Sequence, residues 1–408
     1  MDKPIIVHKY GGSSVATIDR IREVAKNIID YKKKGNHVVV VVSAMGKTTD
    51  HLLSLANEVS ENPTKRELDM LLSTGEQVSI SLLAMMIQSL GEEAISLNGF
   101  QMHMKTDSKY SKARIMAIES ERILEELEKD KIVILAGFQG VTEKNEITTL
   151  GRGGSDTSAV AVAAVLKAKK CQIYTDVDGV YSADPRRVFN AKKMASVSFD
   201  EMLEMAANGT KVLHSRSVEL AKKYEVALEV CSSFEKGVGT MIRDLNMEEM
   251  HLAGLSVEED IAKVSIIKVP DVPGIIYKIT SEIAAAHIPI DMIIQNTNRE
   301  KYNDISFIIK KEDFNQAMLL ISKLKDEIHA EAVHFDKNIA KLSLIGTGIA
   351  NHTEITSVFF QSLYELGINV QMISTSQIRI SCIIDNVSAD HAAQKIHQIF
   401  FGSEDKVQ

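Results

Sequence analysis

Short, continuously apolar segments alternate with helix-like patterns through the first 240 residues of the chain. Residues 5–10 (IIVHKY) and 37–46 (HVVVVVSAMG) predict buried strands. A strand with an unbroken apolar run is typical of a parallel sheet that is covered on both faces. We therefore expect an α/β domain built as a three-layer α/β/α sandwich. Between the two strands, apolar residues recur at helical spacing at Ile18, Ile21, Ala25, Ile28 and Ile29.

Two more segments repeat this form, and both end in loops that suit ligand binding. Residues 131–140 (KIVILAGFQG) and 171–180 (CQIYTDVDGV) each predict a strand followed by a loop rich in glycine or aspartate. In open α/β sheets, ligands bind outside the carboxyl ends of the strands. Because the glycine-rich loops of this chain follow strands, we expect them to share one site.

The last third of the chain repeats itself, which predicts two copies of one small module. Both copies follow the order β-α-β-β-α, which is typical of ferredoxin-like folds. We expect an α/β domain over 1–240, a linker over 241–262, and two ferredoxin-like βαββαβ modules over 263–337 and 338–408. Because catalytic residue types do not cluster in the repeats, we expect them to serve regulation or assembly. The matching segments are 263–269 with 341–347, 288–297 with 368–377, and 305–309 with 380–384.

The composition is that of a soluble globular protein with two or three domains. The chain has 408 residues, of which 45% are hydrophobic and 25% charged. A net charge of −8 argues against nucleic acid as a partner, because nucleic-acid binding needs a basic surface. No apolar run reaches membrane-spanning length and the first residues lack a signal-peptide pattern, so we expect a cytoplasmic protein with no membrane partner. Cys171, Cys231 and Cys382 form no CxxC pair, which excludes a disulfide framework and a thiolate zinc site.

Two short motifs resemble nucleotide-binding loops of other protein classes, but each lacks one glycine. Residues 46–48 (GKT) match the end of a Walker A loop, but Val41 occupies the position of its first glycine, inside a predicted strand. Residues 346–351 (GTGIAN) match the start of a dinucleotide fingerprint, but Asn351 replaces the third glycine. An NAD-dependent enzyme is therefore a weak alternative.

Residues 9–14 (KYGGSS) are a candidate phosphate site, because they place a lysine at a strand end and two glycines before a helix. Backbone N–H groups at such a helix start can hold phosphate oxygens, with Lys9 as a point charge beside them. A tight turn with a surface lysine explains the same residues equally well.

Other loops at predicted strand ends add polar groups to this candidate site. Residues 149–156 (TLGRGGSD) carry three glycines and Arg152, which suggests a carboxylate or phosphate partner. Ser43 and Thr48 bring hydroxyl groups, and Glu76 lies in a helical pattern where a solvated side chain is the alternative. Residues 175–186 (TDVDGVYSADPR) crowd acids, a tyrosine and an arginine into a loop that could also be a plain turn.

Seven motifs in one order give the chain a resemblance that covers essentially all of its length. With these motifs and the repeat that follows them, the chain resembles the aspartokinases of the amino-acid kinase family. The resemblance implies the amino-acid kinase fold followed by two modules of the ACT type. One departure is Ser215, where relatives usually have a proline, and we expect it to loosen a turn. The motifs are KYGGSS, VVSAMGKTTD, LLSTGEQVS, AGFQG, TTLGRGGSDTSA, YTDVDGVYSADPR and KVLHSRSVELA.

The resemblance also implies roles for individual residues. Lys9 and Asp156 would be catalytic, with Asp156 as the organiser of the lysine, and Gly11, Gly12 and Ser13 would form the phosphate cradle. Contacts to aspartate are implied for Ser43, Thr48, Glu76, Arg152, Gly153, Gly154 and Ser155. Contacts to ATP are implied for Lys9, Tyr10, Gly11, Gly12, Thr175, Asp176, Tyr181, Asp184, Arg186, Lys211 and Val212.

The implied reaction converts ATP and L-aspartate into 4-phospho-L-aspartate and ADP, the first step toward lysine, threonine, methionine and diaminopimelate. A side-chain carboxylate with a pKa near 4 is ionised at pH 7, so this reaction needs no general base. Mg²⁺ would be held largely by the phosphates, and we assign it no protein ligand. Two alternatives stay open: a kinase for another small carboxylate such as glutamate or carbamate, and a catalytically silent amino-acid sensor.

The resemblance assigns feedback control by lysine, threonine or both to the repeats. The first repeat keeps a Pro-Gly turn (VPDVPGIIYKI), whereas the second has Thr353 and Glu354 there. We also expect a homo-oligomer, a dimer or tetramer, assembled through the ACT modules. A shorter subunit could start at Met247 or Met250, as in some relatives. The effector candidates are Asp271, Gly274, Ile275, Asp291 and Gln295.

Overall fold

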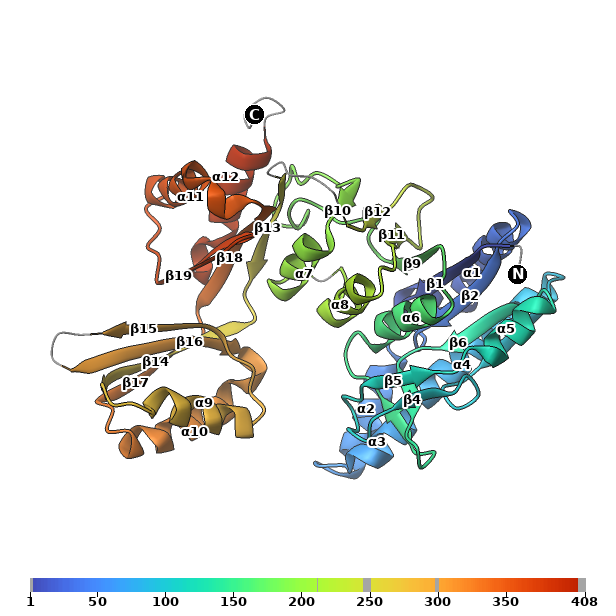
Figure 1. The fold of residues 1–408 in the computed structure, drawn as a ribbon, viewed down its shortest axis with the longest axis horizontal. Helices are drawn as coiled ribbons and strands as arrows, with labels where there is room; N and C mark the ends of the chain where they lie inside the picture. The colour runs from blue at the N-terminus through green and yellow to red at the C-terminus, as the bar shows by residue number, and fades with distance from the viewer. Residues whose placement is uncertain (1–2, 211, 245–250, 298–300, 403–408) are drawn as a thin grey trace. The chain divides into compact units, whose positions relative to one another are not determined.

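The computed structural model describes residues 3–210, 212–244, 251–297 and 301–402. They form two compact units, drawn as a ribbon in Figure 1. Unit 1 comprises Met1–Val180, Lys193–Ala206 and Lys211–Asn246. Unit 2 comprises Tyr181–Lys192, Ala207–Thr210 and Met247–Gln408.

Unit 1 is built around an eight-stranded sheet in the order β10-β12-β11-β9-β1-β2-β6-β3. Its neighbours pair in parallel except β11 and β12, which are antiparallel. The strands are β1 (Ile5–Tyr10), β2 (His37–Val42), β3 (Ala94–Leu97), β6 (Ile132–Ala136), β9 (Lys170–Thr175), β10 (Ser196–Val197), β11 (Leu228–Ser232) and β12 (Thr240–Ile242). A smaller sheet, β5-β4-β7-β8, is formed by β4 (Met104–Thr106), β5 (Ile115–Ile118), β7 (Gln139–Val141) and β8 (Ile147–Thr149).

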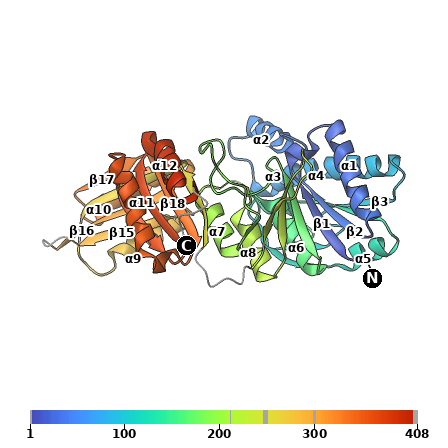
Figure 2. The ribbon, with the colours of Figure 1, turned by 90° about the horizontal axis from the view of Figure 1, so that it is seen from above.

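Helices cover both faces of the large sheet, which confirms the predicted sandwich (Figure 2). On one face, α1 and α4 pack over Tyr10, Val40 and Ile134, and on the other face α6 packs against β1 and β2. Because strand residues alternate between faces, Tyr10 points toward α1 and Lys9 points toward α6. The helices are α1 (Ile18–Lys33), α2 (Thr48–Val59), α3 (Lys65–Leu72), α4 (Thr74–Ser89), α5 (Glu121–Glu128), α6 (Gly154–Val165), α7 (Phe199–Ala207) and α8 (Ser215–Lys223), with a 3₁₀ turn η1 (Gly12–Val15).

By length and composition alone, the continuous segment Lys65–Ser89 could cross a membrane, although we expected no such segment from the sequence. Half of the most apolar 18-residue stretch of that segment is buried in the structure. Ile80, Leu83 and Ile87 of α4 pack in the core of unit 1 against α1 and the sheet. Core packing accounts for the apolar character of this helix.

Unit 2 consists of two four-stranded sheets, each with two helices. The first module runs β14-α9-β15-β16-α10-β17 along the chain, with sheet order β15-β16-β14-β17. The second sheet has the order β13-β18-β20-β19 and carries α11 and α12. The elements are β13 (His251–Glu258), β14 (Ile261–Pro270), α9 (Ile275–Ala285), β15 (Asp291–Thr297), β16 (Tyr302–Lys310), α10 (Phe314–Glu327), β17 (Ala332–Asp336), β18 (Ile339–Thr347), α11 (Thr353–Glu365), β19 (Met372–Ser376), β20 (Arg379–Asp385) and α12 (Ala389–Phe401), with 3₁₀ turns η2 (Lys311–Asp313), η3 (Ile349–Asn351) and η4 (Asn386–Ser388).

The predicted linker over 241–262 is wrong for residues 251–258, because they form the strand β13. β13 pairs antiparallel with β18, so that Leu255 lies opposite Leu344. Both leucines are buried in the core of the second module. The second module therefore takes a strand from the chain before the first module, and the first module is inserted between β13 and β18.

A segment from the middle of the chain also belongs to unit 2. Ala183 and Val188 are buried in the core of the second module, and Ser182 Oγ lies 2.8 Å from His397 Nε2 of α12. Arg187 lies 2.5 Å from Asp390 Oδ1 and forms an ion pair with Glu259. The loop 181–192 is thus part of unit 2, where we had expected a loop of the α/β domain.

Candidate active site

Lys9 is the cation at the centre of the candidate site. It lies near the carboxyl end of β1, between Val41 of β2 and Ile173 of β9. Its ammonium forms an ion pair of 2.7 Å with Asp156 in the first turn of α6, and both side chains are nearly buried, at 11% and 13% exposure. A carboxylate in the first helical turn is favoured by the helix dipole. Asp156 therefore fixes the charge of Lys9 at the edge where ligands bind.

The loop after β1 passes close to the loop after β2. A Cβ added to Gly12 would lie 2.8 Å from the carbonyl oxygen of Ala44, and one added to Gly11 would lie 3.4 Å from Lys9 Nζ. The N–H of Gly46 donates to the carbonyl of Gly12 at 3.0 Å. Glycine is required at position 12 because a side chain would displace backbone. The helix that follows the glycines is the 3₁₀ turn η1, and α1 begins only at Ile18.

Glu76 is buried, so its interpretation as a solvated helix residue is wrong. It lies in the first turn of α4 with 3% of its surface exposed. Its Oε1 accepts a hydrogen bond of 3.0 Å from the N–H of Ala44, while Oε2 has no partner among the described residues. Burial raises the pKa of Glu76 to about 7. A buried carboxylate with one free oxygen is suited to a cationic ligand group.

The loop between β8 and α6 carries Arg152 on a backbone that only glycine readily adopts. Gly151 and Gly153 have φ angles of +78° and +68°. A Cβ on Gly153 would lie 2.4 Å from that of His214, a neighbour that the sequence did not point to. Arg152 itself is exposed and makes no hydrogen bond or ion pair within the described ranges. Its guanidinium is therefore available to a ligand.

The remaining candidates around this loop are held by their own chain. Gly154 and Ser155 are buried at the start of α6. Ser13 is exposed in η1, and the N–H of Ser43 donates to the carbonyl of Tyr10. The hydroxyl of Thr48 donates to the carbonyl of Met45 at 2.6 Å.

Tyr10 was expected to contact the nucleotide, but its side chain does not face the candidate site. Its ring is buried, stacks on Tyr174 at 4.6 Å between centroids, and its hydroxyl accepts from Asn27 Nδ2 at 2.8 Å. The alternation of β1 turns it to the α1 face, opposite to Lys9. Only its backbone lies at the strand end.

The other nucleotide candidates divide between the two units. Thr175 and Asp176 follow the end of β9 in unit 1, where the Thr175 hydroxyl donates to Asp176 Oδ1 at 3.1 Å. Val212 precedes α8, and Lys211 lies outside the described residues. Tyr181, Asp184 and Arg186 belong to unit 2, so the structure does not bring them to Lys9 within one unit. α8 begins at Ser215, the position where relatives usually have a proline. Proline is favoured in the first turn of a helix, and the serine found here leaves the helix start intact.

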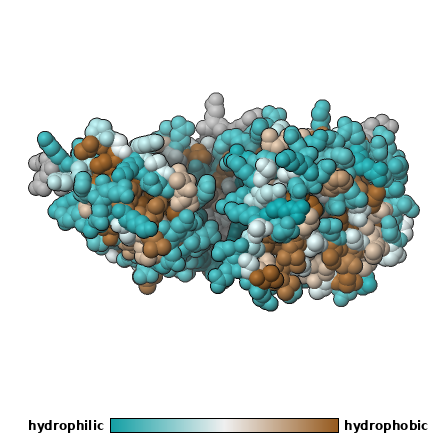
Figure 3. Space-filling view, turned by 90° about the horizontal axis from the view of Figure 1, so that it is seen from below, coloured by the Kyte–Doolittle hydropathy of each residue, from teal (hydrophilic) through white to brown (hydrophobic). Residues whose placement is uncertain are grey.

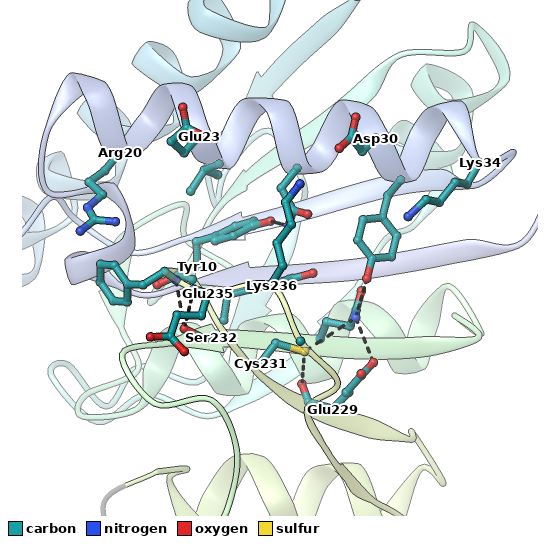
Figure 4. Close-up of a pocket in the computed structure, with 18 residues that line it drawn as sticks. Tyr10, Arg20, Glu23, Asp30, Lys34, Glu229, Cys231, Ser232, Glu235 and Lys236 are labelled. Atoms are coloured by element: carbon teal, nitrogen blue, oxygen red, sulfur yellow. Dashed lines mark hydrogen bonds between the residues drawn. The ribbon is translucent and has the colours of Figure 1, made fainter.

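A cavity of about 340 Å³ lies on the opposite face of the sheet, between α1 and the strands β9 and β11 (Figure 4). Its lining includes Tyr10, Gln172, Glu229 and Cys231, but not Lys9, Glu76 or Arg152. Within the lining, the side-chain amide of Gln172 donates a hydrogen bond of 2.9 Å to Glu229 Oε2. This cavity is separate from the candidate site.

The effector candidates do not form one cluster within a single chain. Gly274 caps α9 with a φ of +98°, and the neighbouring Asp271 accepts a hydrogen bond of 2.9 Å from Asn303. Asp291 instead lies 2.5 Å from the ammonium of Lys341, a buried lysine of β18. Tyr302 of β16 pairs with Pro270, the residue before Asp271, and Ile308 of β16 pairs with Asp291. This spacing along β16 separates Asp271 from Asp291 by about 20 Å. Ile275 starts α9, and Gln295 is exposed on β15, between these ends.

Comparison with known proteins follows the division seen in the fold. The model of the amino acid kinase family matches residues 4–232, and ACT domain models match residues 264–329 and 342–400. An aspartokinase of Mycolicibacterium smegmatis is 47% identical over 410 residues, covering 98% of this chain and 97% of its own length. The aspartate kinase of Stutzerimonas stutzeri is 45% identical over 399 residues and 97% of both chains. The structure of E. coli aspartokinase III in complex with aspartate and ADP has a TM-score of 0.80 at 23% identity, covering 97% of this chain and 100% of that one.

The raised pKa of Glu76 predicts a specific dependence of stability on pH. An unfolded chain gives this carboxyl its ordinary pKa near 4.3, whereas the folded protein holds its pKa at about 7. Its contribution to stability is therefore complete below about pH 4 and is lost as the pH rises through 7. We expect Glu76→Gln, which is neutral at every pH, to unfold at a higher temperature than the wild type at pH 8.5 but not at pH 5. The expected gain is on the order of 3 kcal/mol.

Glu126→Gln is the matched control, measured in the same thermal scans. Glu126 is equally buried, but Lys131 lowers the pKa of its carboxyl. Its stabilising contribution is present above the unfolded pKa, so this variant should lose stability at pH 8.5. Equal melting temperatures for Glu76→Gln and wild type at pH 8.5 would contradict the assigned burial of a charged Glu76.

Proposed function

The chain belongs to the aspartokinases of the amino acid kinase family, and we propose that it transfers the γ-phosphoryl group of ATP to the side-chain carboxylate of L-aspartate. The observation that carries this proposal is a set of three charged groups of unit 1, on β1, on α4 beside the loop after β2, and in the loop after β8. Lys9 is a buried cation, Glu76 is a half-paired carboxylate, and Arg152 is an unpaired guanidinium within the described residues. These groups complement the two carboxylates and the ammonium of aspartate together with the phosphate of ATP.

Arg152 and Glu76 are the proposed contacts to the backbone groups of aspartate. A planar guanidinium binds a carboxylate through two parallel hydrogen bonds, which suits the α-carboxylate. The free Oε2 of Glu76 can accept from the α-ammonium, and the arriving cation would favour the ionised form of Glu76. With both ends of the substrate held, its side-chain carboxylate is left to react.

Lys9 is the proposed catalytic residue for the phosphoryl transfer. The nucleophile is already an anion at pH 7, so the obstacle is repulsion between it and the phosphate. A fixed ammonium reduces this repulsion most where charge moves between the two oxygens. Asp156 holds Lys9 in place at 2.7 Å, and Gly11 and Gly12 allow phosphate oxygens to approach backbone N–H groups.

Mg²⁺ supplies further charge neutralisation to the triphosphate when it is bound. Among the described residues, no group of three or more His, Cys, Asp or Glu side chains is arranged to hold a metal. We propose that phosphate oxygens and water supply most of the ligands of this ion. In unit 1, the nucleotide itself is proposed to contact Thr175, Asp176 and Val212. The expected contacts at Tyr181, Asp184 and Arg186 of unit 2, and at Lys211 outside the described residues, stay predictions.

The product, 4-phospho-L-aspartate, is an activated acyl phosphate that starts the synthesis of lysine, threonine, methionine and diaminopimelate. We infer that the protein works in the cytoplasm, where ATP is available and where its three free, buried cysteines stay reduced. The test of the proposed function is ADP release by the full chain with L-aspartate, L-glutamate, carbamate or no acceptor. Release that depends on aspartate supports the proposal; release with another acceptor alone, or with none of them, contradicts it.

The ACT modules are proposed to bind lysine, threonine or both and to assemble the protein into a homo-oligomer. The strands β15 and β19 each lie at one edge of their sheet. At matching positions of the repeat, Ile293 and Ile373 are about half exposed on these edges, and Figure 3 shows hydrophobic side chains reaching the surface of both units. An exposed strand edge with apolar side chains favours pairing with another chain. A second copy of the chain could then supply the rest of an effector site whose candidate residues lie apart within one chain. A shorter subunit that starts at Met247 or Met250, which lie outside the described residues, stays a prediction.

We predict that Lys9→Ala lowers kcat far more than it raises the KM for ATP. The cost should be on the order of 3–4 kcal/mol, by analogy with removal of one preorganised charge donor. Steady-state ADP release measures both constants. Lys32→Ala, which removes a similarly buried lysine paired with Glu92, is the control and should keep both constants. A higher KM for ATP at unchanged kcat would restrict Lys9 to ground-state binding.

We predict that Arg152→Lys lowers kcat/KM for aspartate, with a loss of transition-state stabilisation of roughly 2–3 kcal/mol, while the KM for ATP is unchanged. The lysine keeps the charge but loses the two-pronged geometry. Arg122→Lys on the exposed face of α5 is the control. Aspartate kinetics that match the wild type would remove Arg152 from the substrate site.

We predict that lysine or threonine inhibits the wild type and that Asp271→Ala weakens this inhibition about tenfold or more. An effector can inhibit only if it binds the inactive arrangement more tightly, and a preference near 2 kcal/mol shifts that balance about thirtyfold. The inhibitory concentrations of both amino acids are measured separately and together. Asp326→Ala on α10 is the control for an exposed acid of the same module. Unchanged inhibition in Asp271→Ala would move the effector site away from this turn.

A further inference from the structure

We propose that Asp69, which none of the sequence motifs pointed to, is the positioning residue that sets the distance between Glu76 and Arg152. These two residues lie on separate elements, and a substrate held at both ends requires a fixed spacing between them. This inference rests on the proposed function of the site. Asp69 touches no substrate; it acts through the two elements that do.

Asp69 is a fully buried carboxylate on α3, with 0% of its surface exposed. Its Oδ2 accepts from the backbone N–H groups of Ser111 and Thr149, both at 2.8 Å. Its Oδ1 accepts from the hydroxyl groups of the same two residues, at 3.1 and 2.8 Å. Four donors thus converge on one side chain, so the charge is compensated without a cation.

The residues bound by Asp69 lie at the base of the loop between β8 and α6, which carries Arg152. Thr149 ends β8, three positions before Arg152. A Cβ on Gly151 would lie 2.8 Å from the carbonyl of Ser111, so the two segments that Asp69 joins are in close contact. From the other side, the guanidinium of Arg216 donates to the carbonyls of Leu150 and Ala113 at 2.9 and 2.8 Å. The loop that carries Arg152 is therefore held at its base by Asp69 and Arg216.

The other end of α3 leads directly to Glu76. The N–H of Ser73 donates to the carbonyl of Asp69 at 3.0 Å, and α4 with Glu76 starts one residue later. Gln139 fixes this junction, because its side-chain amide donates to the carbonyl of Ser73 at 2.9 Å. Asp69 is thus one helical turn from the junction before α4, and its side chain binds the base of the Arg152 loop.

This arrangement gives Asp69 control over substrate length. Aspartate and glutamate differ by one methylene group, which moves the reacting carboxylate relative to the α-carboxylate and ammonium. A displacement of about 1 Å at a reacting group can cost on the order of a hundredfold in rate. A rigid link between Arg152 and Glu76 lets the site favour the shorter acid.

The test compares Asp69→Ala with Asp69→Asn in the full chain. Asparagine can keep all four contacts, because its amide oxygen can face the two backbone N–H groups and its nitrogen can donate to the two hydroxyls. Alanine leaves two buried N–H groups without an acceptor. We expect Asp69→Ala to raise the KM for aspartate about tenfold or more and to reduce the preference for aspartate over glutamate, with the KM for ATP within about twofold. Asp69→Asn should stay within about threefold of the wild type in all constants.

Glu126→Ala is the matched control, because it removes an equally buried carboxylate from α5, paired there with Lys129 and Lys131. It should lower the melting temperature without changing the KM for aspartate. If Asp69→Ala does not fold, Thr149→Val and Ser111→Ala each remove one hydroxyl contact to Asp69. Their expected result is a smaller rise in the KM for aspartate, at least about twofold, again with the KM for ATP unchanged.

Three results would overturn the inference. The first is a rise in the KM for ATP that matches the rise in the KM for aspartate in these variants. The second is unchanged aspartate kinetics in Asp69→Ala or, if that variant does not fold, in Thr149→Val and Ser111→Ala. The third is Asp69→Asn behaving as badly as Asp69→Ala. A wild type that releases no ADP with aspartate would instead contradict the proposed function, so the two failures are distinguishable.

Discussion

Lys9 lies in an almost closed layer between the sheet and α6, and its ion pair with Asp156 is the interaction on which the rest of the site depends. Burying one partner without the other is strongly unfavourable, so β1 and the start of α6 are held in one arrangement. Asp156 lies in the first turn of α6, and Gly151 and Gly153 just before this helix flank Arg152. The phosphoryl-transfer end and the substrate end of the proposed site are thereby joined.

The strands and helices of unit 1 could be predicted from the sequence because they are local and strongly patterned. β2 has an unbroken apolar run since helices cover both of its faces. β13 could not be predicted, because its partner β18 lies beyond the whole first module and its pattern is short. The loop 181–192 was misplaced for the same reason: Ala183 and Val188 are buried by residues of the C-terminal module, which no local pattern reveals.

The candidate site was predictable only as a set of motifs, and its geometry was not. The resemblance named Glu76, but the burial that raises its pKa to about 7 comes from packing against the loop after β2. The resemblance named Tyr10 together with Lys9 as nucleotide contacts, although the strand turns the two side chains to opposite faces. Asp69 left no signal, since its partners Ser111 and Thr149 are 42 and 80 residues away along the chain.

In the proposed site, Arg152 and Glu76 hold the α-carboxylate and ammonium of aspartate, so that only the side-chain carboxylate faces Lys9. The most direct test is to run the reaction with ATP, L-aspartate and hydroxylamine, which traps an acyl phosphate as a hydroxamate. The α and β hydroxamates of aspartate are then separated and compared with the ADP formed. The account predicts the β hydroxamate alone, in step with ADP. The α hydroxamate, or ADP formed without any hydroxamate, would contradict it.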